Sequence, residues 1–256
     1  MSIAKGLVVP VCLVVIWELT ARTWASSSDT LVPPSDVVAS IAELLTNGVL
    51  LTRTLQTIVS AGVGLCYGAL LGLAGGLLLG VSPNAARLLN WPIELLRPMP
   101  SVALIPLSMM AFGFGVKMES AIVGFATFWP VLILAQSAIA GVDRRLLEVA
   151  DVLQLGTAQR VFKIFLPAAA PRLIVALRLA IGLALVVAVT VEIVANPQGL
   201  GYGLVTSQTA LKPADMLAYL FWVGLLGWLL NSALVAVQRH LLAGLGVGNA
   251  LAKEAR

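Results

Sequence analysis

The chain has 256 residues, of which 59% are apolar and only 11% are charged. Because a soluble globular domain carries about 25% charged residues, this composition places the chain among membrane proteins. The formal charge of +4 does not then indicate nucleic-acid binding, since Lys and Arg of membrane proteins gather in cytoplasmic loops. We expect one all-helical domain over residues 1–256 that contacts membrane lipid and binds no nucleic acid.

Six apolar stretches are long enough, or nearly so, to cross a membrane as helices. A crossing of the roughly 30 Å hydrocarbon layer takes about 20 residues at about 1.5 Å per residue. The stretches cover approximately residues 6–24, 55–80, 99–115, 119–141, 171–195 and 216–239. Between the first two, Leu31–Gly48 predicts a short helix lying along the membrane, capped by Ser35 or Asp36 and ended by Gly48.

Two of these stretches carry residues that modify helices. In the second, Gly68 and Gly72 form one GxxxG pair and Gly72 and Gly76 form another, a spacing that lets two helix backbones approach closely. The contact could lie within one bundle or between two copies. At the third, the Arg97–Pro100 segment and Pro106 predict a bend or an unwound turn.

The distribution of Lys and Arg predicts that both termini lie in the cytoplasm. Positive charge is in excess in cytoplasmic loops. With the amino terminus inside, four such residues fall outside, namely Arg22, Arg53, Lys117 and Lys212, and eleven fall inside, namely Lys5, Arg87, Arg97, Arg144, Arg145, Arg160, Lys163, Arg172, Arg239, Lys253 and Arg256. The long polar segment 142–170 then lies in the cytoplasm.

The residues that an enzyme site would need are largely missing. The single His, His240, follows the last apolar stretch, and no group of His, Cys, Asp and Glu has metal-ligand spacing. No Gly-Lys dipeptide occurs, so the phosphate loop of nucleotide hydrolases is missing as well. We therefore expect no enzyme activity, no metal and no cofactor in this chain.

Few ionisable residues lie well inside the apolar stretches, where such residues are usually functional. They are Glu18, Arg178 and Glu192. Arg178 and Glu192 are separated by about 21 Å of helix, so they cannot pair within one helix. The set lacks the relay of groups that ion-coupled carriers use, which disfavours a secondary carrier but leaves it open.

The segment from Leu146 to Arg172 is amphipathic. Its first part places Leu146, Val149, Val152 and Leu153 on one side of a helix. Pro167 disfavours helix at the residue before it, so we expect the chain to turn there and Pro171 to start the next span. Residue types alone leave two roles open, an inner-leaflet helix and a docking surface.

The spacing in this segment resembles the EAA signature of bacterial ABC importer permeases. That pattern is Glu-Ala-Ala, three residues, Gly, nine residues and Ile-x-Leu-Pro, and its slots fall at Glu148, Val149, Ala150, Gln154, Ile164, Leu166 and Pro167. Two slots depart from the pattern: Val149 replaces Ala, and Gln154 replaces Gly. Because Gly156 follows two residues later, the turn is expected to be displaced towards it.

Three further segments resemble the nitrate, sulfonate and taurine subgroup of these permeases. They are Arg97–Leu107 with Phe112-Gly113 after it, Asn196–Tyr202, and Leu31–Ser35. The resemblance implies the fold of a type I ABC importer permease with about six spans. It also implies a bacterial inner-membrane location and a small, anionic solute.

The resemblance further implies partners and site residues. A second permease copy would complete a homodimer, separate ABC ATPase subunits would hold ATP and Mg, and an extracytoplasmic binding protein would deliver solute. The implied ATPase-coupling residues are Glu148, Val149, Ala150, Asp151, Leu153, Gln154, Leu155, Gly156, Ile164, Leu166 and Pro167. For the solute path we expect Ser101, Ser108, Met109, Met110, Thr190 and Glu192. A stand-alone carrier or channel and a membrane scaffold are the alternatives.

Overall fold

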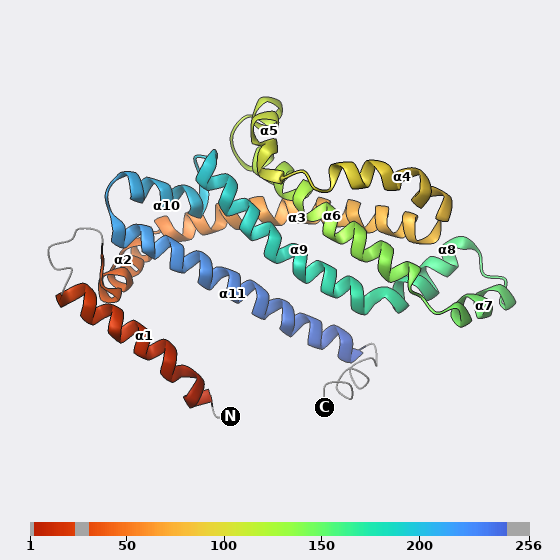
Figure 1. Cartoon of the computed structure of the whole chain (residues 1–256), viewed down its shortest axis with the longest axis horizontal. Coiled ribbons are helices and arrows are strands. Elements are labelled where there is room, and N and C mark those ends of the chain that lie inside the picture. Colours follow the sequence, from red (N-terminus) through yellow and green to blue (C-terminus); the bar gives the residue numbers. More distant parts are fainter. Residues whose placement is uncertain (1–2, 24–30, 245–256) are drawn as a thin grey trace.

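The computed structural model describes the backbone of residues 3–23 and 31–244 and the side chains of residues 8–23 and 31–238. Throughout this described part the regular elements are helices (Figure 1). They are α1 (Ile3–Thr23), α2 (Pro34–Thr46), α3 (Val49–Val81), α4 (Pro83–Leu96), the 3₁₀ turn η1 (Ser101–Leu104), α5 (Ile105–Phe112), α6 (Val116–Ala140), α7 (Arg144–Val152), α8 (Thr157–Arg160), the π-helical turn η2 (Val161–Phe165), α9 (Leu166–Val194), α10 (Gly199–Thr209) and α11 (Pro213–Gly244). The side chains of Lys5, Arg239, His240, Lys253 and Arg256, named above, lie outside the described residues.

The centre of the bundle is α6, which packs along α3 and α9. Gly64, Gly68, Gly72 and Gly76 of α3 are buried on the side that faces α6. A Cβ atom at Gly68 would lie only 2.3 Å from Oγ1 of Thr127, so the two backbones are close because no side chain separates them. The GxxxG pairs therefore make a contact within one chain.

Four helical stretches of the described chain are long and apolar enough to cross a membrane. They are Val49–Val81, Val116–Ala140, Thr157–Thr209 and Pro213–Gln238, which correspond to the predicted spans at 55–80, 119–141, 171–195 and 216–239. The predicted first span at 6–24 forms most of α1, which stands apart from the bundle in Figure 1. The stacked rings of Trp17 and Phe221, with centroids 5.9 Å apart, connect α1 to α11.

The region of the third predicted span, 99–115, differs from the prediction. The α5 helix has eight residues and rises only about 12 Å, so it cannot cross a membrane alone. The pair formed by α4 and the η1–α5 segment has the length and hydropathy for one broken span, with a bend of 83°. Pro98 and Pro100 supply no backbone N–H at the bend, and Gly113, with φ of 68°, ends α5.

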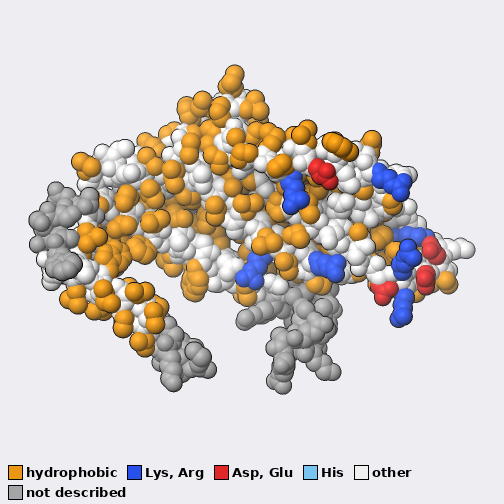
Figure 2. Space-filling view, viewed as in Figure 1, with side chains coloured by type: hydrophobic (Ala, Val, Ile, Leu, Met, Phe, Trp, Pro, Cys, Tyr) orange, Lys and Arg blue, Asp and Glu red, His pale blue; other side chains and the backbone are white. Residues whose placement is uncertain are grey.

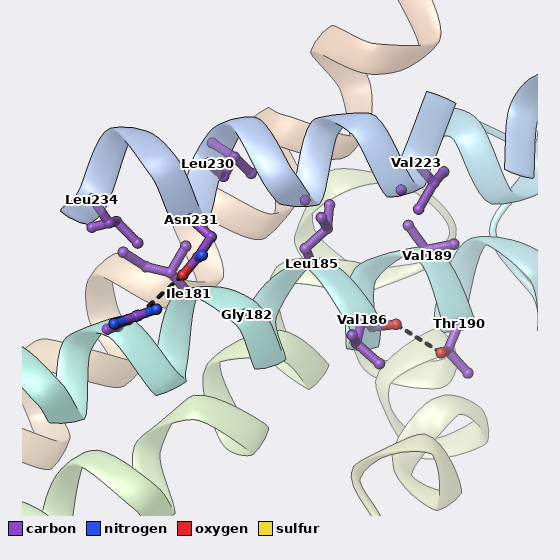
Figure 3. A pocket seen from close by; sticks show the side chains of 13 residues that line it. Ile181, Gly182, Leu185, Val186, Val189, Thr190, Val223, Leu230, Asn231 and Leu234 are labelled. Carbon is purple, nitrogen blue, oxygen red and sulfur yellow. Dashed lines mark hydrogen bonds between the residues drawn. The ribbon is translucent and has the colours of Figure 1, made fainter. Parts of the chain in front are cut away.

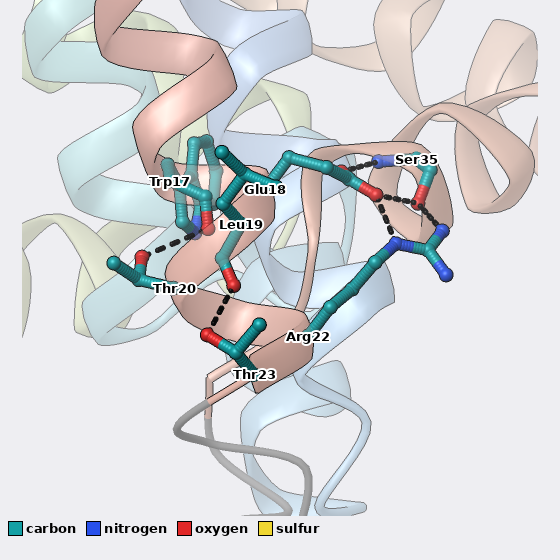
Figure 4. A network of polar contacts seen from close by, with 7 residues as sticks. All are labelled: Trp17, Glu18, Leu19, Thr20, Arg22, Thr23 and Ser35. Atoms are coloured by element: carbon teal, nitrogen blue, oxygen red, sulfur yellow. Dashed lines mark hydrogen bonds and ion pairs between the residues drawn. The ribbon is translucent and has the colours of Figure 1, made fainter.

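Glu18 fastens the end of α1 to the start of α2 (Figure 4). Its carboxylate accepts hydrogen bonds from the backbone N–H of Ser35 at 3.1 Å and from its hydroxyl at 3.0 Å, and it forms an ion pair with Arg22. The expectation that Ser35 or Asp36 caps α2 is wrong, because the N-cap is Pro33 and no side chain of α2 caps the helix. The carboxylate of α1 satisfies the amide instead.

Candidate functional site

Charged side chains gather at the end of the molecule where α7 and α8 lie, while most of the rest of the visible face is apolar (Figures 1 and 2). Asp143 caps the start of α7, because its carboxylate accepts the N–H of Arg145 at 2.9 Å. On one side of α7, Ala150 is buried and Leu147 packs against the cluster around Phe165. This end is the predicted segment 142–170.

The adjoining side of α7 exposes large apolar side chains. Val152 is 83% exposed and Leu153 is 62% exposed, and Leu146 and Val149 are exposed beside them. These four residues are the face that the sequence predicted, and we call them the α7 apolar face. Isolated exposed apolar residues are common, but a contiguous group on one short helix indicates a surface that something covers.

The turn after α7 is centred on Gln154. Its φ is +49°, the left-handed region that glycine adopts most readily. The N–H of Leu155 donates to the carbonyl of Ala150, and the N–H of Gln154 donates to that of Asp151, each at 3.0 Å. This is the Schellman pattern that ends helices. Gly156 has an ordinary φ of −64°, so the expected displacement of the turn towards it is wrong.

Arg160 holds this turn to α8. Its Nη2 atom lies 2.6 Å from the Asp151 carboxylate, and its Nε donates to the carbonyl of Leu155 at 2.8 Å. Both bonds are charge-assisted and therefore stronger than neutral ones. The predicted coupling residues around the turn thus form one structural unit.

The helical path continues from α8 through η2 into α9. The N–H of Leu166 donates to the carbonyl of Val161, five residues back, which is the π-helical pattern. Pro167 lies in the first turn of α9, where its missing N–H is tolerated, and Pro171 lies inside the helix. The predicted turn at Leu166 and helix start at Pro171 are therefore wrong. Ile164 and Leu166 are half-buried, and Pro167 is exposed.

A buried polar centre joins α3, α9 and α10 at the other end of the bundle. Glu192 is 1% exposed. Its carboxylate accepts the hydroxyl of Thr57 at 2.7 Å and the N–H of Gly201 at 2.8 Å, and the N–H of Leu200 donates to the Thr57 hydroxyl at 3.0 Å. Glu192, which we expected in the solute path, therefore satisfies one of the free N–H groups at the start of α10, that of Gly201, and the Thr57 hydroxyl satisfies that of Leu200.

Two residues outside the predicted solute path complete this centre. The amide Nδ2 of Asn196 donates to the carboxylate of Glu119 at 2.5 Å, and its Oδ1 accepts the N–H of Gly115 at 3.0 Å. Both side chains are buried. The available signal was the position of Asn196, a polar residue that follows the end of the apolar stretch four positions after Glu192.

A groove of about 470 Å³ lies between α9 and α11 (Figure 3). Its walls are apolar, with Leu185 and Leu230 among the lining residues. At one end, Nε of Arg178 donates to Oδ1 of Asn231 at 3.0 Å. Towards the other end lies Thr190, whose hydroxyl donates to its own helix.

The six residues expected in the solute path do not share one cavity within a single copy. Ser101 lines a separate hollow beside Trp129, while Thr190 lines the α9–α11 groove. Ser108 is buried like Glu192, whereas Met109 is exposed and Met110 is 84% exposed. The path formed by these residues remains a prediction.

Comparison with known proteins identifies the family. The family described as "Binding-protein-dependent transport system inner membrane component" matches residues 68–246. The putative aliphatic sulfonates transport permease protein SsuC of Bacillus subtilis (strain 168) is 31% identical over 93% of this chain and 86% of its own. The taurine transport system permease protein TauC of Escherichia coli (strain K12) is 27% identical over 90% and 85%.

Two further comparisons agree with these. The nitrate import permease protein NrtB of Leptolyngbya laminosa is 28% identical over 66% of this chain and 61% of its own. A solved structure of the MetNI methionine ABC transporter in inward facing conformations contains a chain with a TM-score of 0.67 and 20% identity, covering 75% of this chain and 95% of that one. The structural likeness confirms the predicted all-helical fold of an importer permease, and the relatives are transport subunits rather than enzymes. The chain therefore belongs to the family of inner-membrane components of binding-protein-dependent transport systems.

Proposed function

We propose that this chain is the permease subunit of an ATP-driven importer of a small, anionic solute. Two copies would form the path, separate ATPase subunits would bind ATP and Mg, and a binding protein would deliver solute from outside. The solute class is supported by relatives whose names specify aliphatic sulfonates, taurine and nitrate.

The observation that carries the coupling role is the α7 apolar face. A short helix that offers a row of apolar anchors suits a groove in another protein. The same helix carries two acidic residues, Glu148 and Asp151, beside two arginines, so it lacks the excess of Lys and Arg that contact with an anionic leaflet favours. We therefore propose that α7 docks on an ATPase subunit rather than on lipid.

The continuous helical path from α8 into α9 supports a mechanical role for this contact. Arg160 fixes α8 to the end of α7, and α9 carries Glu192 in the buried centre at the far end. A displacement of the docked α7 would therefore be passed through α8 to α9, and α9 would move as a rigid rod. This route would connect ATP-driven motion in the partner to the spans.

Substitution of Val152→Asp tests the docking. This side chain is 83% exposed, so the change should leave the fold intact while placing a charge in the contact. We expect ATPase binding to weaken at least about tenfold, which corresponds to about 1.4 kcal/mol. The measurement is the amount of ATPase that co-purifies with a tagged permease. The exposed Asn84→Asp of α4 adds the same charge elsewhere and should retain the ATPase.

The same preparation separates the proposal from its alternatives. Equal ATPase recovery with the Val152→Asp variant would contradict the docking site. Solute uptake that persists without any ATPase would support a stand-alone carrier, and ATPase binding without uptake would support a scaffold.

A further inference from the structure

A polar hollow of about 380 Å³ lies at the end of the bundle opposite α7 and α8. It opens where the chain enters α3 and where α9 leads into α10. Its lining includes Asn47, Arg53, Gln56, Gln198 and Tyr202, so it is more polar than the α9–α11 groove. A polar recess of this kind suits a polar solute.

Arg53 is the cation of this hollow. Its guanidinium lies 5.4 Å from the ring centroid of Tyr202 and 5.2 Å from that of Tyr219, which holds the charge between two aromatic faces. Among the described residues no carboxylate lies within ion-pair distance of Arg53, and its buried Nη1 has no hydrogen-bond partner. Nη1 lies against Gly203, so an acceptor in the hollow would meet the other N–H groups of the guanidinium.

Gln198 contributes a second donor of the same kind. Its Nε2 is buried and also lacks a partner within the described structure. The residue is held in place because the N–H of the next residue, Gly199, donates to Oε1 of Gln56 at 2.9 Å. One guanidinium without a carboxylate partner and one side-chain amide, both from residues that line the same polar hollow, match a ligand that carries several acceptor oxygens and negative charge.

We propose that Arg53 and Gln198 form a binding site for a small oxyanion, such as a sulfonate or nitrate group. We assign this site as the first place on the permease where the imported solute binds. This assignment rests on the proposed function, because that function places α7 and α8 in the cytoplasm and the hollow outside. Anion binding itself requires only the geometry of the hollow.

Fluorine NMR with trifluoromethanesulfonate as the probe tests this site. The full permease is placed in nanodiscs, with and without ATPase and always without binding protein, and saturable broadening of the probe signal is measured. We expect broadening that nitrate and ethanesulfonate reverse and that choline does not. Arg53→Gln should weaken binding at least about tenfold, since a charge-assisted bond is lost. Arg87→Gln removes the same charge from an exposed position of α4 and should leave binding unchanged.

A second variant guards against misfolding of the first. Gln198→Leu removes only the amide donor from a loop, so it should fold and weaken binding several-fold. Unchanged broadening in both variants would overturn the proposal. Absence of anion binding to the unsubstituted permease would also overturn it. If Arg53→Gln then prevents docking of the binding protein, the hollow accepts a carboxylate of that protein instead. Probe binding without ATPase recovery would count against the proposed function and leave the site standing.

Discussion

The close contact of α3 with α6 can be tested by adding one methyl group at two glycines of the same helix. At Gly68 the added Cβ would lie 2.3 Å from Thr127 and 2.5 Å from the carbonyl of Gly124, whereas ordinary contacts begin near 3.4 Å. At Gly62 nothing lies within 4 Å of the added atom. Both substitutions to Ala gain about 1 kcal/mol of helix propensity, so this gain cancels in the comparison.

The remaining difference measures the packing. Forcing a methyl group into a filled contact costs about 1–3 kcal/mol, so Gly68→Ala should be less stable than Gly62→Ala by that amount. Thermal unfolding of both variants in the same detergent, followed by circular dichroism, should show midpoints that differ by roughly 2–4 °C per kcal/mol. Equal midpoints would refute the close contact. If Gly68→Ala instead changed the equilibrium between monomer and dimer, and the unfolding midpoint of the monomer stayed the same, the glycines would lie in a contact between two copies.

Two further predictions concern the turn after α7 and the buried polar centre. Gln154→Gly removes the Cβ that makes this left-handed backbone conformation unfavourable by about 1 kcal/mol, so hydrogen exchange of the α7 amides should slow. Gly156→Ala, at an ordinary φ with open space around it, should leave exchange unchanged. The reverse result would place the turn elsewhere. Thr57→Val leaves a carboxylate oxygen of Glu192 and the N–H of Leu200 without this partner, so it should lower thermal stability by about 2–4 kcal/mol, while exposed Thr52→Val should have little effect. Equal midpoints for the two threonine variants would contradict the bridging role of Thr57.

The sequence predicted most of what depends on local pattern. Apolar length located α3, α6, α9 and α11, because membrane crossing requires it. Periodicity placed Val149 and Val152 on one exposed face of α7. The prolines around Pro98 predicted a bend, since a missing N–H interrupts a helix wherever it lies.

Features that depend on distant partners could not be predicted in this way. Glu18 caps α2 from another helix, and the burial of Glu119 depends on Asn196, which lies 77 positions away in the sequence. The left-handed φ of Gln154 was obscured because nearby Gly156 offered the more favourable residue type for a turn. In each case the tertiary contact, rather than the local preference, decides the outcome.

We propose that this chain transports solute only when a separate ATPase drives it. The most direct measurement is uptake into proteoliposomes that contain the permease and its ATPase, supplied with the binding protein and the ligand that calorimetry identifies among nitrate, taurine and alkanesulfonates. We predict uptake that requires ATP on the ATPase side and persists when ion gradients are collapsed. Uptake that needs an ion gradient and proceeds without ATP would contradict this function.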